Sequence, residues 1–192
     1  MRLQTFTLDT NCLIAVEKNE PAAGAIGTLV DAHTKHSADV AVVAMSASEK
    51  PHGGRSIRNF SEFRDRLETL GWAHLNIILP MKYWDITFWD YDIWVDDDAM
   101  TDLERQIHAI LFPTMQFLWQ DYCDDKGFDS TQIPFGTPWS NRKCDVQAIW
   151  SHIHDGRSVF VTTDGNFHRK KTALIALGAG RIEYPDNAIR LL

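Results

Sequence analysis

Acidic side chains at four positions of the sequence could together bind a divalent metal ion. Asp9 and Asp164 each end a short apolar and β-branched segment and precede a polar residue, the pattern of a strand that runs into a helix. Glu49 follows a second apolar segment, and Asp145 stands at the first turn of the helix expected before Asp164. Carboxylates gathered at one point repel one another unless a cation joins them, and oxygen ligands suit Mg²⁺ or Mn²⁺. We therefore expect these four residues to be both metal ligands and catalytic residues.

A parallel sheet would bring these acids together. Strands are predicted where short apolar segments end in turn or capping residues, over 4–9, 39–44, 75–79, 159–164 and 181–184, with amphipathic helices between them. The carboxyl ends of parallel strands meet at one edge, so Asp9 and Asp164 face one crevice if their strands are neighbours. The expected fold is a three-layer α/β/α domain with a central parallel sheet, formed by residues 1–192.

The middle of the chain departs from this pattern. From Met81 the sequence is both aromatic and acidic. Thr101 and Glu104 have the spacing of a capping box that opens a helix, and residues 124–141 have a loop-like composition. We interpret residues 81–140, approximately, as an insertion within a single domain.

Composition narrows the classes of protein. A 192-residue chain with 44% hydrophobic and 23% charged residues is typical of a globular protein. A formal net charge of −7 argues against a protein that coats nucleic acid with a basic surface. The three cysteines show no paired spacing, and no apolar stretch is long enough to span a membrane. A soluble cytoplasmic protein with reduced thiols, and no membrane partner, is the simplest expectation.

Four short motifs give the sequence a resemblance to the PIN-domain nucleases. They are residues 8–11 (Leu-Asp-Thr-Asn), 46–49 (Ser-Ala-Ser-Glu), 144–149 (Cys-Asp-Val-Gln-Ala-Ile) and 161–167 (Val-Thr-Thr-Asp-Gly-Asn-Phe). The resemblance covers roughly the first fifty and the last fifty-five residues, in the same chain order.

The resemblance implies a PIN-like fold and a Mg²⁺- or Mn²⁺-dependent ribonuclease. Asp9, Glu49, Asp145 and Asp164 match the acidic positions of the family, which cleaves RNA phosphodiesters with a metal-activated water. Many stand-alone members are toxins of bacterial toxin–antitoxin pairs. The resemblance therefore implies an RNA substrate and an antitoxin-like inhibitor protein. The aromatic insertion would also suit a homodimer contact.

Other residues beside these motifs have expected roles. Asn11 and Thr163 are polar neighbours that could orient the carboxylates. Basic side chains near the acids could bind substrate phosphates: Arg142, Lys143, His168, Arg169 and Lys170.

Structural roles compete with these functional ones. Asp9 and Asp164 are good helix-capping residues, and Ser46 with Glu49 has the spacing of a capping box. The basic residues could simply form a solvated face. At the level of function, the alternatives are a non-catalytic PIN-like module that binds RNA or protein, and a metal-dependent phosphohydrolase of small phosphate esters.

Overall fold

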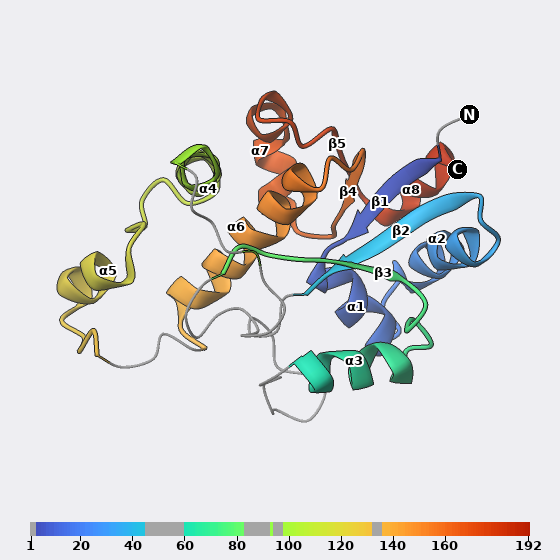
Figure 1. The fold of residues 1–192 in the computed structure, drawn as a ribbon, viewed down its shortest axis with the longest axis horizontal. Coiled ribbons are helices and arrows are strands. Elements are labelled where there is room, and N and C mark those ends of the chain that lie inside the picture. The colour runs from blue at the N-terminus through green and yellow to red at the C-terminus, as the bar shows by residue number, and fades with distance from the viewer. Residues whose placement is uncertain (1–2, 45–59, 83–92, 94–97, 132–135) are drawn as a thin grey trace.

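A five-stranded parallel sheet forms the centre of the protein. The structure, a computed structural model, describes residues 3–44, 60–82, 93, 98–131 and 136–192. The strands stand in the order β3-β2-β1-β4-β5 (Figure 1). Their bounds are β1 (Gln4–Leu8), β2 (Ala38–Val43), β3 (Asn76–Ile78), β4 (Val159–Val161) and β5 (Arg181–Glu183). The predicted α/β class with a central parallel sheet is confirmed.

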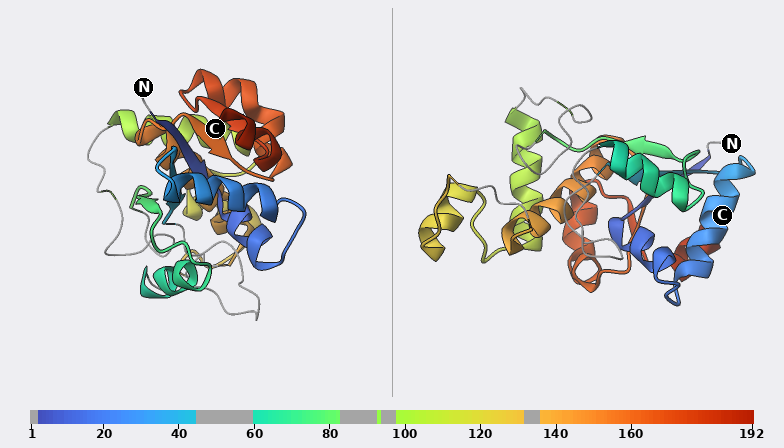
Figure 2. Two further views of the ribbon diagram at one scale, coloured as in Figure 1. Left: turned by 90° about the vertical axis from the view of Figure 1, so that its right-hand side faces the viewer. Right: turned by 90° about the horizontal axis from the view of Figure 1, so that it is seen from below.

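Helices cover both faces of the sheet, which makes three layers (Figures 1 and 2). One face packs against α1 (Thr10–Glu17), α2 (Ala23–Thr34), α3 (Phe60–Thr69) and α8 (Pro185–Ala188). The other face packs against α6 (Pro138–His154) and α7 (Gly165–Ala176), and α4 (Asp98–Leu111) lies against both of these helices. The short helix α5 (Trp119–Lys126) lies at the far end of the molecule from β2 and α2.

The alternation of side chains along β2 explains why its sequence is almost wholly apolar. Val40 and Val42 belong to the core on the α1–α2 side, whereas Ala41 and Val43 belong to the core on the α6–α7 side. A strand in the interior of a sheet with two covered faces has no solvent-facing positions.

Strand β1 is the central strand of the sheet and pairs with β2 on one side and β4 on the other. Thr7 lies opposite Ala41 of β2 and Phe160 of β4, and all of these pairings are parallel. Both neighbours of β1 therefore end at the same edge as Asp9. This edge carries the start of α1 and the start of α7.

Two expectations about helix starts are wrong. Helix α6 begins at Pro138, capped by Thr137, whose side-chain oxygen accepts the Ser140 N–H at 3.2 Å. Asp145 is therefore about two turns inside α6 instead of in its first turn. Pro138 suits a first helical position because no hydrogen bond needs its missing N–H there.

Helix α4 likewise begins before the predicted capping box. Its first residue is Asp98, so Thr101 and Glu104 lie inside the helix. The Glu104 side chain is buried and is paired with Lys143 of α6. Glu104 joins two helices instead of capping its own.

Part of the segment expected as an insertion is described. It contributes α4 and α5, and Ile93 forms an isolated β-bridge with Met81 through hydrogen bonds to Pro80 and Lys82. The aromatic and acidic stretch at 83–92 lies outside the described residues. Among the helices that are described, none is both long and apolar enough to cross a membrane.

Candidate functional site

The carboxylate of Asp9 lies at the carboxyl end of the central strand. Asp9 is 2% exposed and is the N-cap of α1. Its Oδ1 accepts the Thr10 N–H at 2.8 Å, and its Oδ2 accepts from Asn11 Nδ2 at 3.2 Å and from Thr162 Oγ1 at 2.7 Å. Each of these three groups donates, and a carboxylate that only accepts can satisfy them without conflict.

Thr162 connects Asp9 to the neighbouring strand. Its hydroxyl donates to Asp9 and accepts the backbone N–H of Asp164 at 3.0 Å. The Asp9 N–H in turn donates to the carbonyl oxygen of Val161 at 3.0 Å. The ends of β1 and β4 are therefore fixed to each other by both main-chain and side-chain hydrogen bonds.

Asp164 lies three residues beyond the end of β4. It is half-buried and is the N-cap of α7, where its Oδ1 accepts the Asn166 N–H at 2.7 Å. Within the described residues, Asp164 Oδ2 has no hydrogen-bond partner. The strand order and these hydrogen bonds thus agree with the expectation that Asp9 and Asp164 lie at one edge of the sheet.

Both aspartates also perform the structural role that competed with the metal role. Each one caps the helix that follows it. A capping carboxylate keeps one oxygen for the helix and leaves lone pairs on the other, so capping and metal binding are compatible.

Asp145 lies on α6, about two helical turns before a residue that contacts β1. His152 lies two turns further along that helix, and its Nδ1 contacts Thr7 Oγ1 of β1 at 2.8 Å. Asp145 is seven residues earlier and so lies on the same helix face, about 10 Å nearer the helix start. Since α6 leads into β4, it runs antiparallel to the strands. From this helix geometry we expect Asp145, which is half-buried, to lie near the level of the carboxyl edge.

The described residues do not complete a metal site by themselves. In the parts of the chain that the structure describes, no three His, Cys, Asp or Glu side chains are close enough to hold one ion. Glu49, the remaining expected ligand, lies in 45–59, outside those parts. The structure therefore brings together Asp9 and Asp164, and it does not join Asp145 to them in a cluster of three.

The two residues expected to orient the carboxylates, Asn11 and Thr163, differ in the hydrogen bonds that they make. Asn11 donates to the Asp9 carboxylate and can hold it in place. Thr163 is half-buried and makes no side-chain hydrogen bond within the described residues. Its neighbour Thr162 makes the contacts that were expected of Thr163.

Basic residues follow Asp164 along α7. Arg169 is exposed, and its Nη2 lies 3.5 Å from Asn166 Oδ1. Lys170 is half-buried and has no ion-pair partner among the described residues. His168 Nε2 lies 3.0 Å from the Thr162 carbonyl oxygen, which can only accept, so the ring donates through an Nε2–H.

Arg142 and Lys143 are placed differently from the α7 group. The guanidinium of Arg142 lies over the Phe112 ring and near Met115 on an exposed part of α6. Lys143 is 0% exposed, and its Nζ lies 2.8 Å from Glu104 Oε1 and 3.6 Å from the Phe117 ring centroid. Burial lowers the pKa of Lys143, and Glu104 opposes this effect. The ammonium group is enclosed by protein, so Lys143 is not available to a substrate phosphate in this structure.

Cys12 is the nearest thiol to Asp9. Its Sγ donates to the Val161 carbonyl oxygen at 3.3 Å, and burial together with the Asp9 charge raises the pKa of this thiol well above its ordinary value. Cys12 is therefore a neutral packing residue and not a nucleophile.

The fold and this edge define an α/β protein in which two aspartates end neighbouring central strands. Comparisons of the chain with protein-family models, with curated proteins and with solved structures found no match. The class of this protein is therefore defined by its parallel sheet, the strand order and the geometry of this edge.

Proposed function

We propose that the chain is a metal-dependent nuclease of the PIN-domain type that hydrolyses RNA phosphodiesters. The observation that carries the proposal is the hydrogen-bonded unit of Asp9, Thr162 and Asp164, which joins two strands more than 150 residues apart at one sheet edge. Open parallel sheets bind their ligands at this edge. The resemblance of the four motifs to the PIN family agrees with this placement.

The groups present suit a hard divalent cation. Asp9 accepts hydrogen bonds from three donors, and among the described residues Asp164 Oδ2 has no partner and could bind a ligand. Asp9 and Asp164 would hold Mg²⁺ or Mn²⁺, with Glu49 and Asp145 as the further ligands of the proposal. When bound, such an ion activates water and neutralises charge on a phosphodiester.

The residues around the aspartates orient groups and bind phosphate. Asn11 and Thr162 fix the Asp9 carboxylate. Arg169 and Lys170 follow Asp164 on α7 and would contact the phosphate backbone, which offsets the net charge of −7 for an anionic substrate. A small inhibitor protein of the antitoxin kind would act by covering the same edge.

Replacement of Asp164 by asparagine separates its two roles. Asparagine caps a helix as well as aspartate does, so Asp164→Asn keeps α7 and removes only the charge. We expect Mn²⁺-dependent cleavage of a generic RNA to fall about 100-fold or more, because even residues that merely orient metal ligands cost 10- to 100-fold when they are changed. The melting temperature without metal should stay within about 2 °C of wild type.

Asp31→Asn is the matched control, because Asp31 is an exposed aspartate on α2. It should cleave RNA and bind Mn²⁺ like wild type. If Asp164→Asn also bound Mn²⁺ and cleaved RNA like wild type, Asp164 would be a capping residue only. A non-catalytic module would cleave nothing under any condition. Turnover of a chromogenic phosphomonoester without cleavage of RNA would instead support a small-ester phosphohydrolase.

A further inference from the structure

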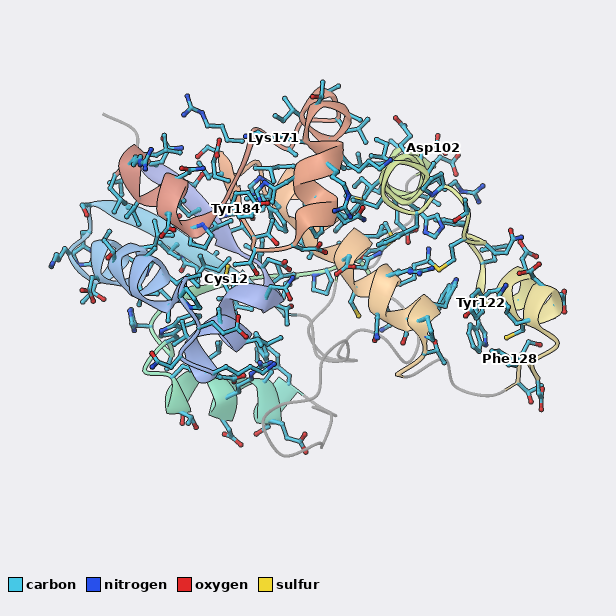
Figure 3. The ribbon with its side chains drawn as sticks, turned by 180° about the vertical axis from the view of Figure 1, so that it is seen from behind. Cys12, Asp102, Tyr122, Phe128, Lys171 and Tyr184 are labelled. Atoms are coloured by element: carbon cyan, nitrogen blue, oxygen red, sulfur yellow. The ribbon has the colours of Figure 1, made fainter. Side chains whose placement is uncertain are left out.

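An exposed aromatic ring lies at the same edge of the sheet as the two aspartates. Tyr184 directly follows β5 at the carboxyl edge of the sheet, next to the end of β4, and it is 43% exposed. Its ring is stacked on the His168 imidazole, with centroids 3.5 Å apart and planes 14° apart. Figure 3 shows Tyr184 beside the sheet on the side where α7 carries Lys171. One face of the phenol ring is therefore supported by protein while much of the side chain stays accessible.

Thr162 holds this ring pair in a fixed position relative to Asp9. Its carbonyl oxygen lies 3.0 Å from His168 Nε2, and its N–H donates to the carbonyl oxygen of Glu183 at 3.1 Å, directly before Tyr184. The same residue binds Asp9 and Asp164 through its hydroxyl. The ring pair and the acidic pair are thus attached to one residue at the end of one strand.

Charge around the ring pair favours a nucleotide over other aromatic ligands. Lys171 Nζ is 2.9 Å from Glu183 Oε1, so this lysine is held next to Tyr184. Arg169 and Lys170 lie on the same turn of α7 as His168. A nucleotide presents a flat neutral base and an anionic phosphate within one ligand, which matches an aromatic face flanked by cations.

Other exposed aromatic side chains do not share this setting. Phe128 is 56% exposed, yet it packs at an angle of 57° on Tyr122 beside α5, far from the sheet edge (Figure 3). Among the described residues, Tyr184 is the exposed large aromatic side chain that adjoins the acidic edge. Phe128 therefore serves as the control position.

We propose that Tyr184, supported by His168, is a subsite that stacks the base of the nucleotide next to the scissile phosphate. This inference rests on the proposed nuclease function, because it assumes that a phosphodiester lies at Asp9 and Asp164. Stacking on an aromatic face tolerates every base, so the subsite positions the strand and does not read its sequence.

Binding of a fluorescent oligoribonucleotide without metal tests the subsite. The probe is a single-stranded ten-nucleotide RNA with 2-aminopurine at one position, measured in EDTA so that no cleavage occurs. We expect binding to wild type to quench the 2-aminopurine fluorescence. Tyr184→Ala and Tyr184→Leu should lose this quenching and bind the RNA about 5- to 100-fold more weakly. Tyr184→Phe, which keeps the ring, should retain both.

Two comparisons separate stacking from general damage. Phe128→Ala should bind and quench like wild type. A ten-nucleotide RNA backbone without bases should bind more weakly than the normal RNA to wild type and to Tyr184→Phe, but not to Tyr184→Leu. If Tyr184→Leu bound and quenched like wild type, or lost the same affinity to the abasic RNA as wild type, the subsite would be disproved.

The outcome for the subsite is distinguishable from the outcome for the proposed function. Metal-dependent RNA cleavage with no effect of Tyr184→Leu on binding would refute the subsite and leave the nuclease intact. Quenching that depends on Tyr184, without cleavage under any metal, would support a base-binding position and refute the nuclease.

Discussion

Thr162 connects several residues of the candidate site that come from different elements. Its hydroxyl joins Asp9 to the Asp164 N–H, and its main chain contacts His168 and Glu183. Thr162→Val keeps the shape of the side chain but leaves the Asp164 N–H and one Asp9 lone pair without this partner. We expect a loss of about 1–3 kcal/mol of unfolding free energy and a 10- to 100-fold loss of metal affinity or activity.

Urea unfolding and Mn²⁺ titration measure these two effects separately. Thr162→Ser keeps the hydroxyl and should retain most of the metal affinity. Thr163→Val is the adjacent control, because the Thr163 side chain makes no hydrogen bond within the described residues. Equal Mn²⁺ affinity of Thr162→Val and wild type would show that this hydroxyl does not orient Asp9.

The sequence predicted Asp9 and Asp164 because each one ends a recognisable strand. It did not distinguish Thr162 from Thr163, since adjacent polar residues after a strand look equivalent in a sequence. Only the pairing of β1 with β4 decides which hydroxyl meets Asp9. The ring pair was missed for the same reason: His168 and Tyr184 lie on different elements and meet through β4 and β5. Tyr184 alone, at the end of the last predicted strand, was the available signal.

At the scale of elements, a buried polar cluster fixes α4 to α6. Lys143 and Glu104 are 0% and 1% exposed and lie 2.8 Å apart, and Gln147 Nε2 donates to the same Glu104 oxygen at 3.2 Å. Lys143→Met should destabilise the protein by about 3–5 kcal/mol, because it leaves a buried charge without its main partner. The double variant Lys143→Met with Glu104→Leu should recover most of this loss.

Chemical denaturation of the single and double variants checks the prediction. Lys170→Met removes a lysine from α7 and should change the unfolding free energy by no more than about 0.5 kcal/mol. A double variant as unstable as Lys143→Met would mean that the cluster stabilises through packing of its aliphatic stems and not through charge pairing.

The same cluster shows where local patterns mislead. Thr101 and Glu104 have the spacing of a capping box, yet the helix starts at Asp98 and Glu104 turns toward α6. Helix α6 begins at Pro138, although the glycine and prolines around this position predicted a loop. Strands and amphipathic helices were predictable from periodicity. Helix starts were harder to predict, because a side chain that could cap its own helix can instead pair with a neighbouring helix.

At the scale of the whole molecule, we expect a buried histidine to make the folded protein less stable in mild acid. His152 contacts Thr7 of β1 and the Ala179 carbonyl, and burial lowers its pKa to about 4. The unfolded chain has a histidine pKa near 6.5, so it binds a proton more readily than the folded state. This contribution to stability is present above pH 6.5 and is lost as the pH falls from about 6.5 to about 4.

Urea unfolding at two pH values measures the effect. The unfolding free energy should be about 2 kcal/mol lower at pH 5 than at pH 7 through His152 alone. His108 adds to the loss, since burial lowers its pKa as well. His36 is exposed, and His36→Gln is the matched control substitution. An NMR titration that found the His152 ring titrating near pH 6.5 would contradict the prediction.

The order of the strands has a consequence for synthesis. The central strand β1 is made first, yet its neighbour β4 and the hydroxyl that holds Asp9 follow 153 residues later. A nascent chain therefore displays Asp9 for most of its translation without the partner strand. If the edge cleaves RNA, it cannot do so until residue 164 has left the ribosomal exit tunnel. Before that point, the nascent chain cannot cleave the messenger RNA from which it is being translated.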